Sequence, residues 1–297
     1  MKVLVTGSSG LIGSALIPFF KERNHQIYKL VRARADLLPH EIAWDPDRGV
    51  INPCLLEGLD AVVHLAGENL MGRWTATKKE KIRTSRVNGT RLLCRALSHL
   101  KQQPGVLVCA SAVGYYGNRG DEILTEQSSR GRGFLADVCE EWEEATQATS
   151  EKGIRTLNLR FGMVLSSKGG ALKQMLSIFK WGLGGQLGLG DQYVSWISID
   201  DLTRVINYVI QEEKLAGPVN AVTPYPVTNA ELTKTLGYIL HRPTFFPMPT
   251  FAVRLIFGEL GQGLLLSSER VQPKKLVGAG FRFDYPHLEE ALRALLT

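Results

Sequence analysis

The chain has 297 residues, of which 44% are hydrophobic and 22% are charged. This composition is typical of a globular protein and excludes a disordered, collagen-like or coiled-coil chain. The net charge of +6 at pH 7 is not gathered into one tail. Solvated surface or anion-binding pockets explain such a modest excess, so we expect no nucleic-acid partner.

Apolar strands alternate with helices in the first part of the chain. The predicted strands are Val3–Val5, Gln26–Val31, Ile42–Trp44, Ala61–Leu65, Val106–Ala110 and Thr156–Arg160. The predicted helices are Ser14–Arg23, Lys78–Leu100 and Phe134–Lys152. This alternation predicts an α/β fold with a mostly parallel sheet that is covered on both faces.

The sequence changes character after Leu165. A glycine-rich stretch (residues 182–190) comes first, and shorter elements follow it. These are predicted at Val194–Ile199, Asp200–Ile210, Pro218–Val222, Asn229–His241 and Leu288–Leu296. We therefore divide the chain into an α/β domain (residues 1–165) and a smaller substrate-side region (residues 166–297). The boundary is soft, because we expect the chain to cross back to the sheet.

A glycine loop lies between the first strand and the first helix, with Gly7, Gly10 and Gly13 at spacings of three. Side chains at these positions would keep the backbone away from a pyrophosphate. The helix that follows the loop offers free N–H groups and the positive end of its dipole to such an anion, and Leu11 and Ile12 of the loop join the three glycines as candidate cofactor-binding residues. The context predicts a dinucleotide site; the alternative is a strand–helix turn without a ligand.

The second strand ends at Arg32, with Arg34 nearby, and the next acidic residue is Asp36. Enzymes selective for NAD usually place an acid near this point to hold the ribose 2′-hydroxyl. A guanidinium instead pairs well with a 2′-phosphate. The sequence therefore predicts NADP(H) rather than NAD(H), unless Arg32 is simply a surface arginine.

The Thr6-Gly7 start and the G-x-x-G-x-x-G spacing resemble the short-chain dehydrogenase/reductase superfamily, in particular its extended, sugar-nucleotide-epimerase-like branch. Narrower features resemble the YfcH-like group of epimerase-family proteins, which carries a small C-terminal domain. These features are Gly67-Glu68-Asn69, Arg73-Trp74, Ser85-Arg86, Trp142-Glu143 and the tail from Pro273 to Pro286. The resemblance implies a Rossmann-like, doubly wound parallel sheet, with the C-terminal epimerase-family domain inside residues 166–297.

The resemblance also implies a path for the cofactor. The family runs it past the backbone after the Ala61–Leu65 strand, here Leu65, Ala66, Gly67 and Glu68. Arg86 is then expected near the phosphates and Arg160 near the other end. Ser111 takes the place of the active-site serine, although Ala112 is the alternative if the loop has no extra residue. For Arg86 the alternative is a solvated helix charge.

The superfamily's proton-transfer pair is missing. The family needs a tyrosine with a lysine four residues on, but the matching positions hold Leu135 and Cys139. Tyr115 and Tyr116 are the substitute acids that we consider, although an unassisted phenol titrates near ~10. The alternative for both is packing under their loop.

Three functions stay open. The first is an NADP-dependent oxidoreductase or epimerase that acts on a small polar carbonyl or sugar-nucleotide-like substrate. The second is a non-catalytic NADP(H)-binding sensor or regulatory module, and the third is an enzyme whose substrate supplies the proton chemistry. No apolar run approaches the ~20 residues of a membrane helix, and four widely spaced cysteines suggest neither disulfides nor a metal site. We expect a cytoplasmic protein, with a homodimer possible.

Overall fold

The computed structural model describes residues 1–32 and 35–296. Its main element is an eight-stranded sheet in the order β12-β8-β6-β5-β1-β2-β3-β4. Neighbouring strands run parallel, except that β4 runs antiparallel to β3 at one edge. The strands are β1 (Lys2–Thr6), β2 (Gln26–Arg32), β3 (Glu41–Asp45), β4 (Val50–Ile51), β5 (Ala61–His64), β6 (Val106–Ala112), β8 (Arg155–Phe161) and β12 (Gly217–Ala221).

The strand order reverses beside β1. The chain builds outward from β1 through β2 to β3, then starts again on the other side of β1 with β5. A reversal of this kind is where open α/β sheets bind ligands, at the carboxyl ends of the strands. The expected Rossmann-like, doubly wound sheet is therefore confirmed.

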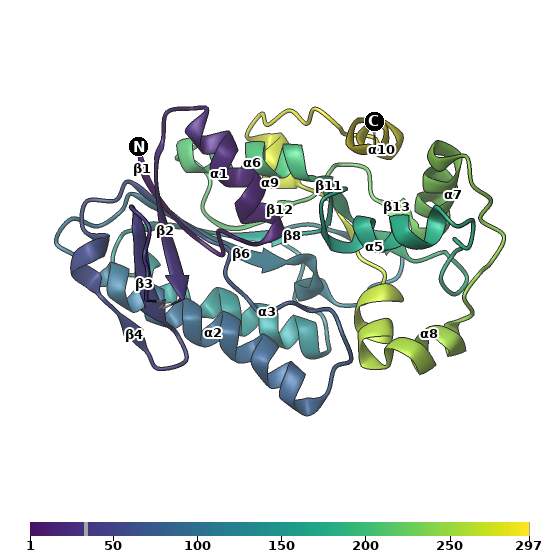
Figure 1. Ribbon diagram of the computed structural model, residues 1–297, viewed down its shortest axis with the longest axis horizontal. Helices are drawn as coiled ribbons and strands as arrows, with labels where there is room; N and C mark the ends of the chain where they lie inside the picture. Colours follow the sequence, from purple (N-terminus) through teal and green to yellow (C-terminus); the bar gives the residue numbers. More distant parts are fainter. Residues whose placement is uncertain (33–34, 297) are drawn as a thin grey trace.

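Helices cover both faces of the sheet (Figure 1). On one face lie α1 (Leu11–Lys21) and α6 (Ile199–Gln211), and on the other lie α2 (Ala76–Ser98), α3 (Phe134–Glu144) and α4 (Gln147–Ser150). Successive side chains of a strand point to opposite faces. Val3 and Val5 accordingly join the core with α1 and α6, whereas Leu4 packs with the α2 side.

Most of the smaller elements lie toward one end of the molecule, but α9 lies beside α6 and β12 (Figure 1). The minor strands are β7 (Ile123–Leu124), β9 (Met163–Leu165), β10 (Tyr193–Val194), β11 (Trp196–Ser198), β13 (Val227–Thr228) and β14 (Arg270–Val271). The helices are α5 (Gly170–Phe179), α7 (Asn229–Leu240), α8 (Thr250–Phe257), α9 (Lys274–Gly278) and α10 (Leu288–Leu296). As expected, the chain crosses back to the sheet with α6 and β12 after its excursion beyond β9.

Two predicted elements are divided in the structure. The helix predicted at Phe134–Lys152 breaks after Glu144, where Thr146 turns its hydroxyl back to the carbonyl of Glu143 at 2.6 Å. The strand predicted at Val194–Ile199 is interrupted at Ser195. There β10 leaves to pair with β13 and β11 pairs with β9, so one apolar run serves two sheets.

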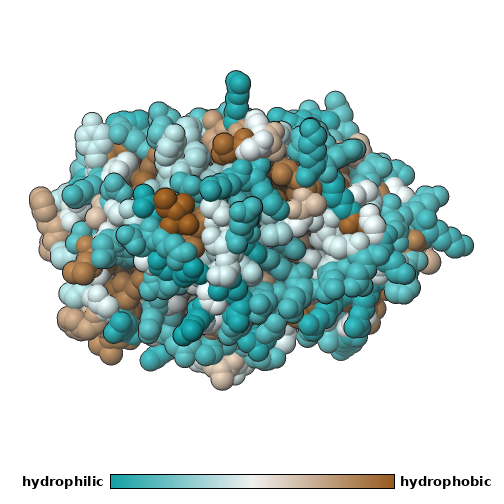
Figure 2. All heavy atoms as spheres, turned by 180° about the vertical axis from the view of Figure 1, so that it is seen from behind, coloured by the Kyte–Doolittle hydropathy of each residue, from teal (hydrophilic) through white to brown (hydrophobic). Residues whose placement is uncertain are grey.

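The surface is mostly hydrophilic, but apolar side chains are exposed at the end where α7 and α8 lie (Figure 2). Exposed apolar residues of the α5–α8 region include Ile178, Trp181, Leu183, Leu189, Phe245, Phe246, Phe251, Leu255 and Ile256. Among the residues described, no helix has both the length and the apolar character needed to cross a membrane.

Candidate functional site

The glycine loop is shaped by close backbone contacts. Gly7 has a φ of +65°, and a Cβ there would lie 2.7 Å from the carbonyl carbon of Leu65. A Cβ at Gly13 would lie 2.4 Å from the carbonyl oxygen of Gly7. Both positions therefore require glycine, because the loop packs tightly on the end of β5 and on its own helix.

Gly10 has a different role, since a Cβ there would meet only the Gly7 oxygen, at 3.2 Å. Gly10 is the N-cap of α1, and no side chain caps the first N–H groups of this helix. The first turn also contains no acidic residue. The amino end of α1 is thus an uncapped positive dipole end with room in front of it, which suits an anion.

A buried histidine supports the loop from below. The Thr6 hydroxyl accepts the N–H groups of Leu65 and Ala66 at 3.0 and 3.1 Å and lies 2.7 Å from His64 Nδ1. His64 Nε2 lies 3.0 Å from the hydroxyl of Thr90 on α2. Burial lowers the pKa of His64 to about 4, so the ring is neutral at neutral pH. His64 is a core residue that fixes the backbone after β5.

Arg86 presents a partly exposed cation beside the predicted cofactor path. Its Nη1 donates to the carbonyl oxygens of Glu68 and Ile82 at 2.9 and 3.2 Å. Its guanidinium carbon lies 3.3 Å from where a Gly67 Cβ would be. Within the described ranges no carboxylate forms an ion pair with it, because Glu68 binds Lys78 at 2.7 Å instead. The charge is available to an anion that passes Gly67.

Arg32 ends β2 with an exposed side chain, in register with Trp44 of β3. It stands at the carboxyl end of the strand next to β1, as the sequence predicted. Arg34, which the sequence placed nearby, lies outside the described residues.

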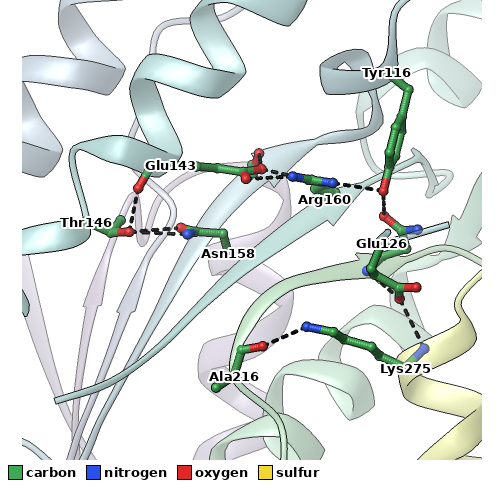
Figure 3. Close-up of polar contacts among 10 residues, drawn as sticks. Tyr116, Glu126, Glu143, Thr146, Asn158, Arg160, Ala216 and Lys275 are labelled. Atoms are coloured by element: carbon green, nitrogen blue, oxygen red, sulfur yellow. Dashed lines mark hydrogen bonds and ion pairs between the residues drawn. The ribbon is translucent and has the colours of Figure 1, made fainter. Parts of the chain in front are cut away.

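A charge network lies beneath the loop that follows β6, residues 113–122, which we call the β6 loop. Arg160 donates to both carboxylate oxygens of Glu143 at 2.8 Å, and the Ser111 hydroxyl donates to the same carboxylate at 2.7 Å. Arg160 also donates to the Tyr116 hydroxyl at 2.9 Å, which in turn donates to Asn220 at 2.7 Å. Figure 3 shows this chain of contacts running from α3 across β8 to β12.

The network continues into the C-terminal region. Glu126 accepts the backbone N–H groups of Asn220 and Lys275 at 3.1 and 3.2 Å, and the Lys275 ammonium donates to the Ala216 carbonyl at 2.8 Å. Lys275 belongs to α9, so polar contacts join the sheet, the β6 loop region and the C-terminal helices (Figure 3).

This arrangement changes the roles expected for three predicted site residues. Tyr116 is fully buried, and burial raises its pKa to about 12. Its hydroxyl is engaged on both sides, so the structure supports packing rather than acid catalysis. Ser111 and Arg160 are each 2% exposed and bound to Glu143. Direct contact of either with substrate or cofactor stays a prediction; the observed role of both is to fix Glu143.

Tyr115 differs from its neighbour. It is half-buried, and its ring lies 3.5 Å from the guanidinium carbon of Arg160. The phenol hydroxyl is not among the network's hydrogen-bonding groups in the described structure. Of the two candidate tyrosines, Tyr115 is the one whose hydroxyl is not committed there, and its catalytic role stays a prediction.

An apolar residue and a buried thiol occupy the two positions where the family has its tyrosine and lysine. Leu135 packs against the β6 loop, 3.2 Å from where a Gly114 Cβ would be, and joins a cluster with Leu260 and Leu265 from the C-terminal region. Cys139 is buried, and burial raises the pKa of its thiol to about 12. Neither residue can move a proton as the usual pair does.

Sequence reasoning missed Glu143, Asn220 and Glu126 as a network. A signal existed, because Arg160 falls within an apolar strand that was expected to be buried. A buried arginine needs a carboxylate partner, and Glu143 directly follows the Trp142 anchor.

Hollows of about 250 and 420 Å³ also occur in the structure. The first lies between α1, α6 and residues 280–282, and the second lies at the amino edge of the sheet around Gly105 and Arg155. Neither is lined by a predicted site residue. In the described part of the chain, no group of three or more His, Cys, Asp or Glu side chains is arranged to hold a metal.

The parallel sheet, the glycine loop and the uncapped α1 together define a protein of the dinucleotide-binding α/β class. The chain belongs to the NAD dependent epimerase/dehydratase family, whose model matches residues 3–223. A domain of unknown function, DUF1731, matches residues 248–295. The resemblance to epimerase-family proteins is therefore confirmed.

Relatives extend over nearly the whole chain. Epimerase family protein Mb2239 of Mycobacterium bovis is 43% identical, over 98% of this chain and 96% of its own length. Epimerase family protein SDR39U1 of Homo sapiens is 33% identical over 100% of both chains. A crystal structure of human SDR39U1 (isoform 2) with NADPH aligns with this chain over 99% of both chains, with a TM-score of 0.89 and 32% sequence identity.

Proposed function

We propose that this chain binds NADP(H) along the carboxyl ends of β1, β2 and β5 and uses it to reduce, oxidise or epimerise a small polar carbonyl or sugar-nucleotide-like compound. The observation that carries the proposal is the uncapped amino end of α1 behind the open Gly10 position. The NADPH in the human SDR39U1 structure supports it, since that protein shares the whole fold.

The residues present fit a dinucleotide phosphate. The backbone N–H groups of Leu11, Ile12 and Gly13 at the start of α1 would hold the pyrophosphate. Arg86, which has no carboxylate partner in the described chain, would donate to phosphate oxygens beside Gly67. Arg32 would pair with the 2′-phosphate, a group that guanidinium recognises through two parallel hydrogen bonds. When bound, NADPH supplies a hydride.

The network under the β6 loop would hold the substrate side rigid. Arg160 and Ser111 fix Glu143, and Tyr116 ties the loop to β12. Tight support of this kind keeps a site within the small tolerances that catalysis needs. These residues therefore act as positioning groups in the proposed reaction.

Calorimetric titration of NADPH and NADH tests the cofactor proposal. We expect wild type to bind NADPH more tightly than NADH by at least about 10-fold, a difference of roughly 1.4 kcal/mol. Arg32→Ala should remove this difference by weakening NADPH alone. Arg95→Ala, at an exposed position near the end of α2, is the matched control and should change neither affinity. Equal affinities in wild type would contradict the assignment.

A second function, a non-catalytic NADP(H)-binding module, is favoured by one observation. Leu135 and Cys139 fill the positions of the proton-transfer pair with groups that cannot transfer protons, and Leu135 is packed under the C-terminal region. NADPH binding without NADPH consumption over a panel of small carbonyl compounds would establish this alternative. Consumption of NADPH with any member of the panel would exclude it.

A further inference from the structure

Glu269 occupies a junction between three parts of the chain. Its N–H donates to the Tyr193 carbonyl at 3.1 Å, and its own carbonyl accepts the Ser195 hydroxyl at 2.6 Å. The carbonyl of Ser195 in turn accepts the N–H of Met163 at 2.8 Å. The backbone of Glu269 is therefore fixed beside the segment that leaves the carboxyl end of β8.

The residue before it ties the same segment to the β6 loop. The N–H of Ser268 donates to the Asn118 side chain at 3.2 Å, and the Ser268 hydroxyl donates to the Gly120 carbonyl at 2.5 Å. Just after Glu269, β14 pairs in parallel with β7. The C-terminal segment thus holds Glu269 beside the β6 loop, which follows the carboxyl end of β6.

Glu269 lies deep in this junction, although the residue as a whole is not fully buried. Ser267 and Ser268 are buried, whereas Glu269 is only half-buried. The Ser267 hydroxyl donates to it at 3.1 Å, and no ion pair to a lysine or arginine forms in the part of the chain that the structure describes. Burial raises the pKa of Glu269 to about 7. At neutral pH this carboxyl group can both hold and release a proton.

The nearby arginines are engaged with other groups, so they do not draw the proton from the Glu269 carboxyl group. Arg270 turns its guanidinium over the Tyr193 ring, 4.7 Å from its centre. Arg119 of the β6 loop is held by Glu122 at 2.6 Å. The charge of Glu269 also adds a small part to the raised pKa of the buried Cys139 thiol on α3, after burial and the charge of Glu143. Cys139 stands where the family's lysine would be, so Glu269 acts electrostatically on the vacated position.

We propose that Glu269 is the proton donor and acceptor for the substrate, in place of the missing tyrosine, acting from the C-terminal region rather than from α3. The inference rests on the proposed function. In the reduction, the carbonyl carbon receives a hydride with its two electrons from NADPH. The π-electron pair moves to oxygen, which takes the proton of Glu269 and completes the alcohol. The carboxylate that is left regains a proton from water.

Three proteins test this proposal: wild type, Glu269→Gln and the exposed control Glu290→Gln on α10. NADPH affinity is measured first by calorimetry, and then NADPH oxidation with glyceraldehyde, diacetyl and phenanthrenequinone between pH 5 and 9. We expect wild-type kcat to fall above pH about 7, and Glu269→Gln to lose about 10²-fold in kcat or more. NADPH affinity should change less than 2-fold, and Glu269→Asp should restore part of the rate.

A readout independent of turnover uses protein labelled with ¹³C at the glutamate carboxyl groups. One resonance should titrate near pH 7 and be absent from Glu269→Gln, while the control keeps it. A Glu269 resonance that titrates near the ordinary value overturns the proposal, as does an unchanged kcat in Glu269→Gln. No turnover by wild type with NADPH bound also overturns it, together with the enzymatic part of the proposed function. Failure to bind NADPH at all would instead identify the cofactor assignment as the faulty step.

Discussion

At the glycine loop the chain is shaped by its backbone, whereas the network under the β6 loop depends on charged side chains. Gly7 and Gly13 allow contacts that a Cβ would block at 2.7 and 2.4 Å. In the network, Arg160 and Glu143 come from a strand and a helix, and Asn220 comes from a strand about 60 residues further on. One region is held by the absence of side chains and the other by their charges.

This difference separates two kinds of vulnerability. A buried ion pair adds little net stability when intact, but removing one partner leaves an uncompensated charge. A glycine position with a negative φ tolerates a side chain where the space beside its backbone is free, whereas a position with a positive φ, such as Gly7, is strained by any side chain. The network should therefore lose stability when one charged partner is removed, and the glycine loop should lose stability when a methyl group is added.

The largest effect should come from breaking the Arg160–Glu143 pair. Arg160→Met leaves the Glu143 carboxylate, whose side chain is only 13% exposed, without its cation, and we expect a loss of about 3–5 kcal/mol in the free energy of unfolding. Urea unfolding measures it. The double variant Glu143→Gln/Arg160→Met should lose less than Arg160→Met alone, because no charge is then left unpaired.

The matched control is the exposed pair of Arg293 and Glu289, whose atoms approach to 2.7 Å while both side chains are about half exposed. Arg293→Ala should change stability by less than about 1 kcal/mol. If Arg160→Met changed the free energy of unfolding as little as Arg293→Ala does, the network would not contribute to stability, and the comparison of the two regions would fail.

The glycine-loop region should show a pH dependence through His64. The pKa of His64 is lowered to about 4 in the folded state, against 6.5 unfolded. The unfolded chain therefore binds more protons between these values, so stability is full above pH 6.5 and is lost as pH falls toward 4. The expected loss is about 3 kcal/mol. Unfolding by urea at pH 5 and 7 in wild type and His64→Asn should show a pH difference that the variant reduces.

How much could be predicted differs between the same two regions. The glycine loop, the alternation of strands and helices and the place of Arg32 at the end of β2 could be predicted from contiguous sequence, because strand, turn and helix signals are local. The Glu143 network could not be read in this way, since its members meet only through β8, α3 and β12. Tyr116 shows the limit, because nothing local distinguishes its buried hydroxyl from that of half-buried Tyr115.

Two alanine variants would sharpen the description of the glycine loop. Gly13→Ala places a methyl group against the Gly7 carbonyl and should lower stability by about 1–3 kcal/mol. Gly10→Ala meets only one atom at 3.2 Å and has an extended backbone, so stability should change by less than about 1 kcal/mol. Its methyl group instead enters the space proposed for the pyrophosphate. Calorimetry should then show NADPH affinity reduced at least about 10-fold in a protein that still folds.

A second pH effect distinguishes Glu269 from His64 by its sign. The pKa of Glu269 is raised to about 7 in the folded state, so the folded chain binds more protons than the unfolded chain between pH 4.5 and 7. Wild type is therefore destabilised by this group as pH rises, and Glu269→Gln, which does not titrate, escapes the loss. We expect the stability of the variant to match that of wild type near pH 4 and to exceed it by about 1–2 kcal/mol above pH 7, after allowance for partial exposure.

A stability difference that stayed constant with pH in urea unfolding would mean that this carboxyl titrates normally. The proton would then have to come from elsewhere, with Tyr115 as the next candidate, because its half-buried ring lies beside Arg160.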